Sequence, residues 1–462
     1  MSKIEVDAID KQSGSTLTLG GSGTAVTLAS GATQSGFGRS GSVNWDTTPK
    51  TTTFTGVSGN GYFVNTTAGV VTANLPASPS AGDIMAVVDY AGTADTNNIT
   101  VGRNGSNING AASDQTISKE NSGATFVYVD GTQGWKFTET SNVSDIELQP
   151  TYIVATGGTI TEDGNFKVHT FTGPGTFCVS QVGNPIGSTT VDYLVVAGGG
   201  AGGTTNSVAG AGGGGGGAGG YRESSGAASG SYSRSPLGAC VSALPVTVTG
   251  YPVTVGAGGA TEPFPQPGNS ASNPGSNSVF AGSTTITSAG GGGGTNFAVR
   301  SPGGSGGGMG EDSGTYPGGV GNSPPVAPPQ GNDGGANGVS PHYGSGGGGG
   351  ATAAGADGTT TNAGAGGAGA TSSINGTPTA RAGGGGGGTY GGVDSSGGPG
   401  EAAGGVGGGG KGSSYPKGDN AVAGTANTGG GGGGTGANPN GASNYSGKAG
   451  GSGIVIIRYK FQ

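Results

Sequence analysis

The glycine-rich part of the chain begins with Val191-Asp192-Tyr193-Leu194-Val195-Val196-Ala197-Gly198-Gly199-Gly200, where an apolar β-strand runs directly into glycine. It ends with a second apolar strand, Gly451-Ser452-Gly453-Ile454-Val455-Ile456-Ile457-Arg458-Tyr459. Between these two clasp strands lie repeated blocks of five or six glycines, at 212–217, 290–294, 346–350, 383–388 and 429–434. Glycine has no side chain to pack and loses the most conformational freedom on folding. The blocks are therefore either disordered or held by backbone hydrogen bonds between extended chains.

Composition favours the ordered alternative. Charged residues make up only 9% of the chain, whereas disordered segments are usually highly charged or monotonous in sequence. Collagen is excluded because no strict three-residue glycine period is present. The prolines of 324–329 favour the polyproline-II conformation, which has no internal hydrogen bonds. We therefore expect an all-β, elongated fibre of small β domains followed by a C-terminal polyglycine-II helix bundle.

Charge and length exclude several classes of protein. The net charge of −8 argues against nucleic acid as a partner, because phosphate contacts need clustered Lys and Arg. The N-terminus, 1–7, is polar, so no secretory signal is expected, and no apolar run approaches the length of a spanning helix. We expect the chain to fold in a cytoplasm and to leave it, if at all, by lysis. Cys178 and Cys240 are too few for a disulfide framework and are expected to be reduced and buried, with a disulfide as the alternative.

No motif in the chain carries enzyme chemistry. The GxGxxG matches follow from composition alone, and Gly410-Lys411-Gly412-Ser413 lacks the residues that complete a phosphate-binding loop. The two histidines, His169 and His342, form no catalytic or metal-ligand pattern, and His169 is expected on a strand face with its hydrogen bonds satisfied. The sequence therefore predicts a protein that is not an enzyme, with no catalytic residues, no metal and no cofactor.

Four parts are expected along the chain: an N-terminal attachment segment at 1–40, a β-rich shaft domain at 41–145, a β collar at 146–190, and the glycine-rich domain at 191–462 with a β insertion at 221–288. In the first part, 15–20 is echoed by 24–29, and this strand pattern is too small to bury its own apolar face, which favours a homotrimer. Trp135 is expected in the core or at a trimer contact. The strands expected in the shaft domain and in the collar are 51–55, 61–65, 70–75, 84–90, 98–101, 124–130, 135–138 and 166–171. Those in the insertion are 245–249, 252–255 and 284–287.

The glycine-rich domain resembles that of bacteriophage tail fibres and of the tip adhesins of T-even-like long tail fibres. The residues that carry the resemblance are Tyr193-Leu194-Val195-Val196-Ala197 before glycines, Val253-Thr254-Val255-Gly256-Ala257-Gly258-Gly259, Ser278-Val279-Phe280 before Ala289-Gly290, and the terminal clasp strand. The resemblance covers about 146–462, and 61–65, 75–83 and Gly134-Trp135 are similar to β domains of phage fibre shafts. It implies a rigid sandwich of glycine helices whose distal loops contact the host receptor. The tip adhesins are separate chains, whereas here the domain is fused to a shaft and an anchor.

The candidate receptor-binding residues come from counting the glycine passes. If the two clasp strands are antiparallel neighbours, the chain leaves and returns at one end, and loops alternate between that base and the tip. This count puts 204–207, 295–300, 324–329, 351–362 and 389–390 at the tip, and 341–343 at the base. Rigid aromatics and Arg are common anchors of recognition surfaces. The predicted receptor-binding residues are Asn206, Phe297, Arg300, Pro325, Pro328 and Tyr390, and Tyr316, His342, Tyr343 and Tyr415 replace them if the count is off by one pass.

The resemblance implies a bacteriophage tail fibre protein in the virion, bound to the phage tail or an adaptor through 1–40 and to a host polysaccharide or outer-membrane protein through the tip. A non-adhesive structural component of a virion or matrix is the alternative. Ice binding would need regular ranks of threonine, and the threonines are scattered. A polysaccharide-degrading fibre would need a carboxylate pair, which the sequence does not supply.

Overall fold

The structure is a computed structural model that describes residues 43–140, 146–148, 150–205, 212–228, 230, 232–238, 241–265, 270–297, 299–310, 314–390, 401–414, 420–437 and 445–462. The chain divides into two compact units, Met1–Gln149 and Pro150–Gln462. The predicted attachment segment, 1–40, lies outside the described residues. The boundaries between the four predicted parts stay predictions, although the division at 149/150 lies close to the expected end of the shaft domain.

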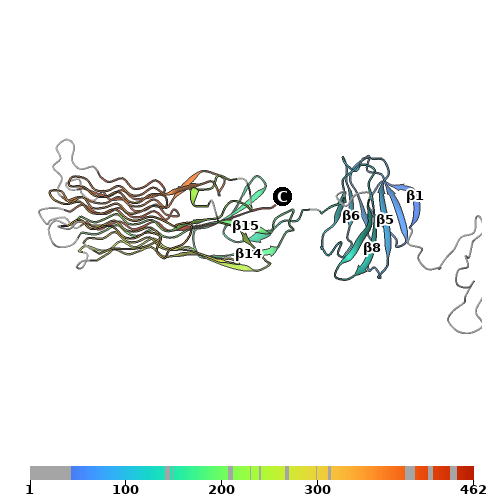
Figure 1. The fold of residues 1–462 in the computed structure, drawn as a ribbon, viewed down its shortest axis with the longest axis horizontal. Helices are drawn as coiled ribbons and strands as arrows, with labels where there is room; N and C mark the ends of the chain where they lie inside the picture. The colour runs from blue at the N-terminus through green and yellow to red at the C-terminus, as the bar shows by residue number, and fades with distance from the viewer. Residues whose placement is uncertain are drawn as a thin grey trace, which may run out of the picture. The chain divides into compact units, whose positions relative to one another are not determined.

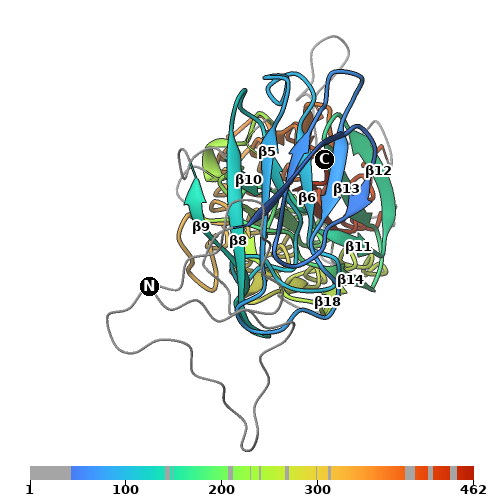
Figure 2. The ribbon, with the colours of Figure 1, turned by 90° about the vertical axis from the view of Figure 1, so that its right-hand side faces the viewer.

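The first unit is a sandwich of two five-stranded sheets. One sheet has the order β1-β3-β5-β8-β9, and the other has the order β10-β7-β6-β4-β2. Strand β8 lies between β5 and β9 (Figure 2). The strands are β1 (Asn44–Lys50), β2 (Phe54–Thr55), β3 (Asn60–Val64), β4 (Val71–Asn74), β5 (Ile84–Asp89), β6 (Ile99–Gly102), β7 (Gln115–Ile117), β8 (Gly123–Asp130), β9 (Gly134–Thr140) and β10 (Ile146–Leu148).

Alternation along these strands sends every second side chain into one core between the sheets. Tyr62 and Val64 of β3 face Val71 of β4 and Ile99 of β6 in that cluster. Trp135 is fully buried among them, so its predicted core position is confirmed. The sequence pattern missed β1 and β7, because neither is rich in apolar side chains.

The second unit contains two further sheets and a hairpin. Their orders are β11-β14-β18-β19-β20 and β12-β13-β23-β15-β16, with β17 paired to β15, and β21 pairs with β22. The elements are β11 (Val154–Thr156), β12 (Thr159–Asp163), β13 (Phe166–Phe171), β14 (Gly175–Gln181), β15 (Thr190–Val196), β16 (Tyr221–Glu223), the 3-10 helix η2 (Pro236–Gly238), β17 (Leu244–Pro245), β18 (Gly250–Thr254), β19 (Ser278–Ala281), β20 (Thr285–Ser288), β21 (Ala370–Ser372), β22 (Thr379–Arg381) and β23 (Ile454–Lys460).

The two clasp strands are antiparallel neighbours, as predicted. In β15 and β23, Tyr193 pairs with Ile457 and Val196 with Ile454, and β23 also pairs with β13 on its other side. Both faces of β23 are buried: Ile457 and its alternate neighbours pack against the β14 sheet, and Ile456 packs towards the β21–β22 hairpin. The end of the chain therefore forms the centre of the second unit's largest sheet.

Two single-residue expectations have opposite outcomes. His169 of β13 is buried and satisfied as predicted: its Nδ1 lies 2.7 Å from the Gly157 carbonyl oxygen and its Nε2 lies 3.1 Å from the Tyr459 hydroxyl. Burial lowers the pKa of His169 below its ordinary value. Cys178 is a free thiol and exposed, so its predicted burial is wrong; Phe177 and Val179 take the core-facing positions of β14 and leave Cys178 on the other face. Cys240 lies outside the described residues.

The glycine segments run side by side from the strands of the second unit towards its opposite end (Figure 1). Along 213–220, successive amides donate to different neighbouring segments. One set is Gly213 to Thr435, Gly216 to Gly432 and Gly219 to Gly429; a second is Gly214 to Thr295, Gly217 to Gly292 and Gly220 to Ala289; a third is Gly215 to Gly346 and Ala218 to Gly349. Every third amide therefore donates to the same neighbouring segment, whereas the residues of a β-strand alternate with a period of two.

The described elements are β-strands apart from η2, so the all-β prediction is confirmed. The described glycine blocks belong to no strand or helix, and the expected polyglycine-II helices are not among the assigned elements. Their order comes from the cross-segment hydrogen bonds, which satisfy buried backbone groups that have no side chains around them.

Candidate functional site

The second unit has two ends that can be told apart by their hydrogen bonds. The strand end holds β15, β16 and β23, with their paired strands. The far end is the opposite end of the glycine segments. It includes Thr204, which the first glycine segment after β15 reaches. Gly203 donates to Gly214, and Gly214 donates to Thr295 at 2.9 Å, which brings three segments to the same level of the far end.

Phe297 and Arg300 lie at the far end, as the pass count predicted. They follow Thr295, whose hydroxyl accepts a hydrogen bond from the Gly310 amide at 2.9 Å. Phe297 is half-buried and Arg300 is exposed. The far end therefore presents an aromatic ring and a guanidinium from one loop.

Tyr390 also lies at the far end, together with two residues that the count put at the base. The Tyr390 amide donates to the His342 carbonyl at 3.2 Å, and the ring centroids of Tyr343 and Tyr390 are 6.0 Å apart in an edge-to-face contact. The segment that follows Tyr343 also begins at the far end. The Ser345 amide donates at 2.9 Å to the carbonyl of Gly388, which lies two residues before Tyr390. We call His342, Tyr343 and Tyr390 the far-end aromatic cluster.

Tyr316 belongs to the same end of the unit. Its amide donates to the Asn337 side-chain oxygen at 2.7 Å, and the Asn337 amide donates back to the Tyr316 carbonyl. The neighbouring loop at 359–362 is joined to the cluster, because the His342 amide donates to the Thr360 carbonyl at 3.0 Å. Tyr415, the fourth residue of the alternative set, lies outside the described residues. Asn206, one of the predicted receptor-binding residues, also lies outside them.

Pro325 and Pro328 lie at the strand end, which corrects their predicted position. Their loop ends at Gln330, whose carbonyl accepts from the first amide of β16, that of Tyr221, at 2.8 Å. The Gln330 side-chain oxygen accepts from Ala289, directly after β20. The two prolines therefore do not meet Phe297, Arg300 or Tyr390.

The pass count failed at a reversal that has only a short sequence signal, Pro302-Gly303. Gly304 donates to Gly290 near the strand end, and Ser305 then starts a new pass that reaches the level of Gly215 at Gly308. The bend at 303–305 consists of glycine and serine and follows Pro302 directly, so no bulky loop marks it. The expected loop at 351–362 likewise spans both ends, because Ala351 donates to Ala382 beside β22 and Gly358 donates to Ala336.

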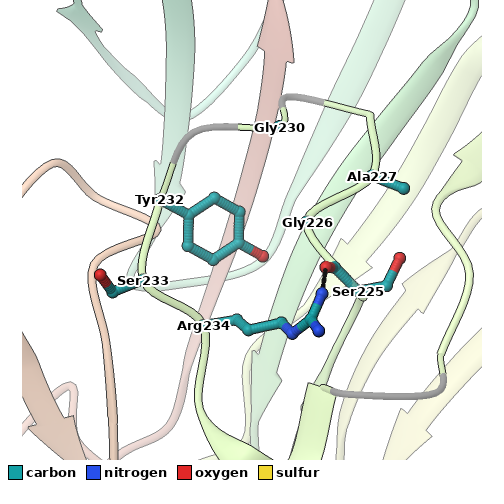
Figure 3. A pocket seen from close by; sticks show the side chains of 7 residues that line it. All are labelled: Ser225, Gly226, Ala227, Gly230, Tyr232, Ser233 and Arg234. Atoms are coloured by element: carbon teal, nitrogen blue, oxygen red, sulfur yellow. Dashed lines mark hydrogen bonds between the residues drawn. The ribbon is translucent and has the colours of Figure 1, made fainter.

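A separate open hollow of about 610 Å³ lies beside β16 (Figure 3). Its lining is Ser225, Gly226, Ala227, Gly230, Tyr232, Ser233 and Arg234. The Arg234 guanidinium donates to the Ser225 carbonyl across the hollow, and the Tyr232 ring lies beside it (Figure 3). This lining offers hydroxyls, one cation and an aromatic ring, and it contains no carboxylate.

A buried carboxylate, Glu223, lies behind this segment. It accepts hydrogen bonds from Tyr221, from the amide and hydroxyl of Ser235, and from Ser372 of the β21–β22 hairpin. Burial raises the pKa of Glu223 above its ordinary value, and the hydrogen bonds from Ser235 and Ser372 act in the opposite direction. Because Glu223 is 1% exposed, it joins three segments and is closed to a substrate.

Within the described ranges, no group of three or more His, Cys, Asp and Glu side chains is arranged to hold a metal ion. Nor does any described helix have the length and apolarity needed to cross a membrane. A family model described as a glycine-rich domain matches residues 170–460, which is more than half of the chain. The chain belongs to this glycine-rich domain family. No curated protein matches the chain.

The glycine-rich domain match contains both clasp strands, the strand end and the far end, whereas the first unit lies outside it. The far-end cluster was not predicted as a group, although each of its members was noticed singly. The available signal was a bulky residue next to a glycine block: Tyr343 precedes the 346–350 block and Tyr390 follows the 383–388 block.

Proposed function

We propose that this chain is a bacteriophage tail fibre protein that attaches the virion to the host cell surface, and that its glycine-rich domain is a polyglycine-II helix bundle. Support for the bundle comes from the three-residue return of the hydrogen bonds along 213–220, which is the period of a polyproline-II backbone. The absence of side chains supports it further: a Cβ added at Gly214, Gly215 or Gly216 would lie 2.0–2.2 Å from a neighbouring carbonyl oxygen.

The observation that carries the adhesive role is the far-end aromatic cluster on this scaffold. Tyr343 and Tyr390 come from different loops and meet in ring contact, with His342 joined to them through the backbone. Tyrosine supplies a large, amphipathic contact area at low entropic cost. Glycine segments can set only the spacing, so discrimination between receptors belongs to these loops. Phe297 and Arg300 form a second candidate contact on the same end.

The test is binding of the purified, labelled chain to intact cells of a panel of bacterial strains. We expect at least one strain to bind the chain. In that strain, the Tyr343→Ala/Tyr390→Ala variant should bind about tenfold or more weakly, as the loss of ~1.4 kcal/mol would produce. The matched control is Pro325→Ala/Pro328→Ala at the strand end, which should bind like the unaltered chain.

The alternative function is a structural virion or matrix component without a receptor. It predicts that no strain binds the unaltered chain. Normal binding by the Tyr343/Tyr390 variant with an unchanged melting temperature would instead move the contact to Phe297 and Arg300, whose double alanine variant is tested in the same assay.

Assembly is part of the proposal. We propose a homotrimer that binds the phage tail or an adaptor protein through 1–40 and a cell-surface polysaccharide or outer-membrane protein through the far end, and that is made in the host cytoplasm without enzymatic activity. Light scattering should give three times the chain mass of 43.1 kDa. A monomeric mass for the intact chain would contradict the trimer.

A further inference from the structure

Three aromatic side chains form a row on the first unit. The ring centroids of Trp45 and Phe63 are 5.1 Å apart, and those of Phe63 and Tyr90 are 6.5 Å apart. Trp45 is 42% exposed and Tyr90 is 55% exposed, while Phe63 between them is half-buried. We call these three residues the aromatic row.

Strand register places the row on the face of the β1-β3-β5-β8-β9 sheet that points away from the core. Tyr62 and Val64 of β3 enter the core, so Phe63 between them points outward. Trp45 of β1 pairs with Gly61, two residues before Phe63 and on the same face. Phe63 pairs with Val88 of β5, and Tyr90 follows two residues later.

Gly61 supplies a floor for the indole. A Cβ at this position would lie 2.7 Å from the Trp45 Cε3 atom, so the ring rests directly on the backbone of β3. A fixed ring loses little freedom when a ligand stacks on it. The row is thus a pre-formed surface, held by its own strand pairing.

The size of the row argues against a second copy of the chain as its occupant. An aromatic side chain buries about 150–250 Å² when it is fully covered, and these rings are already partly covered. Their remaining surface amounts to a few hundred Å² at most, well below the roughly 800 Å² per partner of a standard protein interface. A small ligand, or one narrow stretch of a polymer, fits this area better.

The charge around the row argues against an acidic polymer. Lys50, at the end of β1, pairs with Val64, and its Nζ lies 5.8 Å from the centroid of the core-facing Tyr62 ring. This cation therefore lies on the opposite side of the sheet from the row, where it is paired with Asp46 at 2.8 Å. The Tyr90 amide donates to the carbonyl of Val64, the last residue of β3, and Asn65 follows directly after it. Its side-chain oxygen accepts from the amide and hydroxyl of Thr67. The described rim beside Tyr90 is therefore made of amide and hydroxyl groups, without the positive groove that accompanies base stacking in nucleic-acid sites.

We propose that the aromatic row is a binding platform for a neutral polysaccharide. A pyranose ring presents weakly positive C–H groups on its faces and hydroxyls at its edge. The C–H faces are attracted to the negative faces of Trp45 and Tyr90, and the hydroxyls reach the amide and hydroxyl groups of the rim. Exposed aromatic patches with polar rims are typical of interaction sites on otherwise polar surfaces.

The chain offers a direct optical probe. It has two tryptophans, and Trp135 is fully buried, so a change in tryptophan emission on ligand addition reports Trp45. The full-length chain is titrated with dextran, yeast mannan and laminarin, with alginate as an acidic comparison, and is run in native gels that contain each polymer. We expect at least one neutral polymer to shift the emission and retard the chain.

The variants are Trp45→Ala and Tyr90→Ala, with the exposed Val57→Ala in the same unit as the control. Each aromatic variant should bind about tenfold or more weakly with unchanged melting, and Val57→Ala should bind normally. The Tyr343→Ala/Tyr390→Ala variant should also bind normally, which separates this platform from the far-end loops. The proposal is overturned if no neutral polymer binds, if alginate alone binds, if both aromatic variants bind normally, or if Trp45→Ala lowers the oligomeric mass.

Discussion

Gly215 shows why single residues in the glycine blocks tolerate no side chain. A Cβ at this position would lie 2.0 Å from the Gly385 carbonyl oxygen, and that oxygen belongs to backbone that cannot rotate away. We predict that Gly215→Ala lowers the free energy of unfolding of the second unit by about 1–3 kcal/mol, as overpacking of a filled interior does. Chemical denaturation followed by circular dichroism measures the change.

Gly173 is the matched control for this substitution. An added Cβ there meets no atom within 4 Å, and its backbone is not in the left-handed region. Gly173→Ala should leave the free energy of unfolding nearly unchanged. Equal effects of the two substitutions would show that the blocks are not closely packed.

Glu223 gives the second unit a pH dependence with a defined sign. Burial raises the pKa of Glu223 above 4.5 in the folded state, so the folded chain holds this proton more tightly than the unfolded chain does. The resulting stabilisation is fully present below about pH 4.5 and is lost as the pH rises through the folded-state pKa. Glu223→Gln removes this titration while keeping the shape of the side chain.

We therefore predict that the stability of the unaltered chain, relative to Glu223→Gln, falls as the pH rises from about 4.5. Melting curves of both chains at a series of pH values measure the difference. A constant difference between the two chains would mean that Glu223 does not titrate differently on folding, whatever the size of the offset.

Strand β23 is the element on which the second unit depends. Ile457 is completely buried, and its strand lies between β13 and β15. We predict that Ile457→Asp abolishes the cooperative melting of the second unit, because an unpaired carboxylate in a core costs several kcal/mol. The first unit has a separate core and should keep its own transition.

The exposed Val248, between β17 and β18, provides the control. Val248→Asp introduces the same charge into the second unit at a solvent-facing position and should melt like the unaltered chain. Limited proteolysis followed by mass spectrometry assigns each transition to its unit. Loss of both transitions in Ile457→Asp would contradict independent folding of the units.

The elements that sequence reasoning predicted correctly are those with a strong apolar signal. The clasp strands, β3, β5, β8 and β13 alternate or run as apolar stretches, and their pairing followed from the need to bury them. The turn at Gly304–Ser305 was missed, because in a glycine-rich segment a reversal uses nearly the same residues as the straight passes, and Pro302-Gly303 was its only signal. That missed turn moved Pro325 to the wrong end and hid the contact between Tyr343 and Tyr390.

At the scale of the whole molecule, two different principles build the two units. The first unit buries side chains such as Trp135 between two sheets. Beyond the strands of the second unit, buried backbone groups satisfy one another across neighbouring segments, so most stability there comes from hydrogen bonds and close packing without side chains. The glycine blocks predicted this contrast together with the low share of charged residues, because glycine offers no side chains to pack.

The central claim is that the glycine blocks are held by cross-segment hydrogen bonds, and amide hydrogen exchange of the intact chain tests it most directly. The account predicts that amides of 213–220, 384–388 and 430–434 exchange as slowly as those of β15 and β23, because each opens only with the whole unit. Exchange of these glycine amides at the rate of an unfolded peptide, while β15 and β23 stay protected, would contradict it.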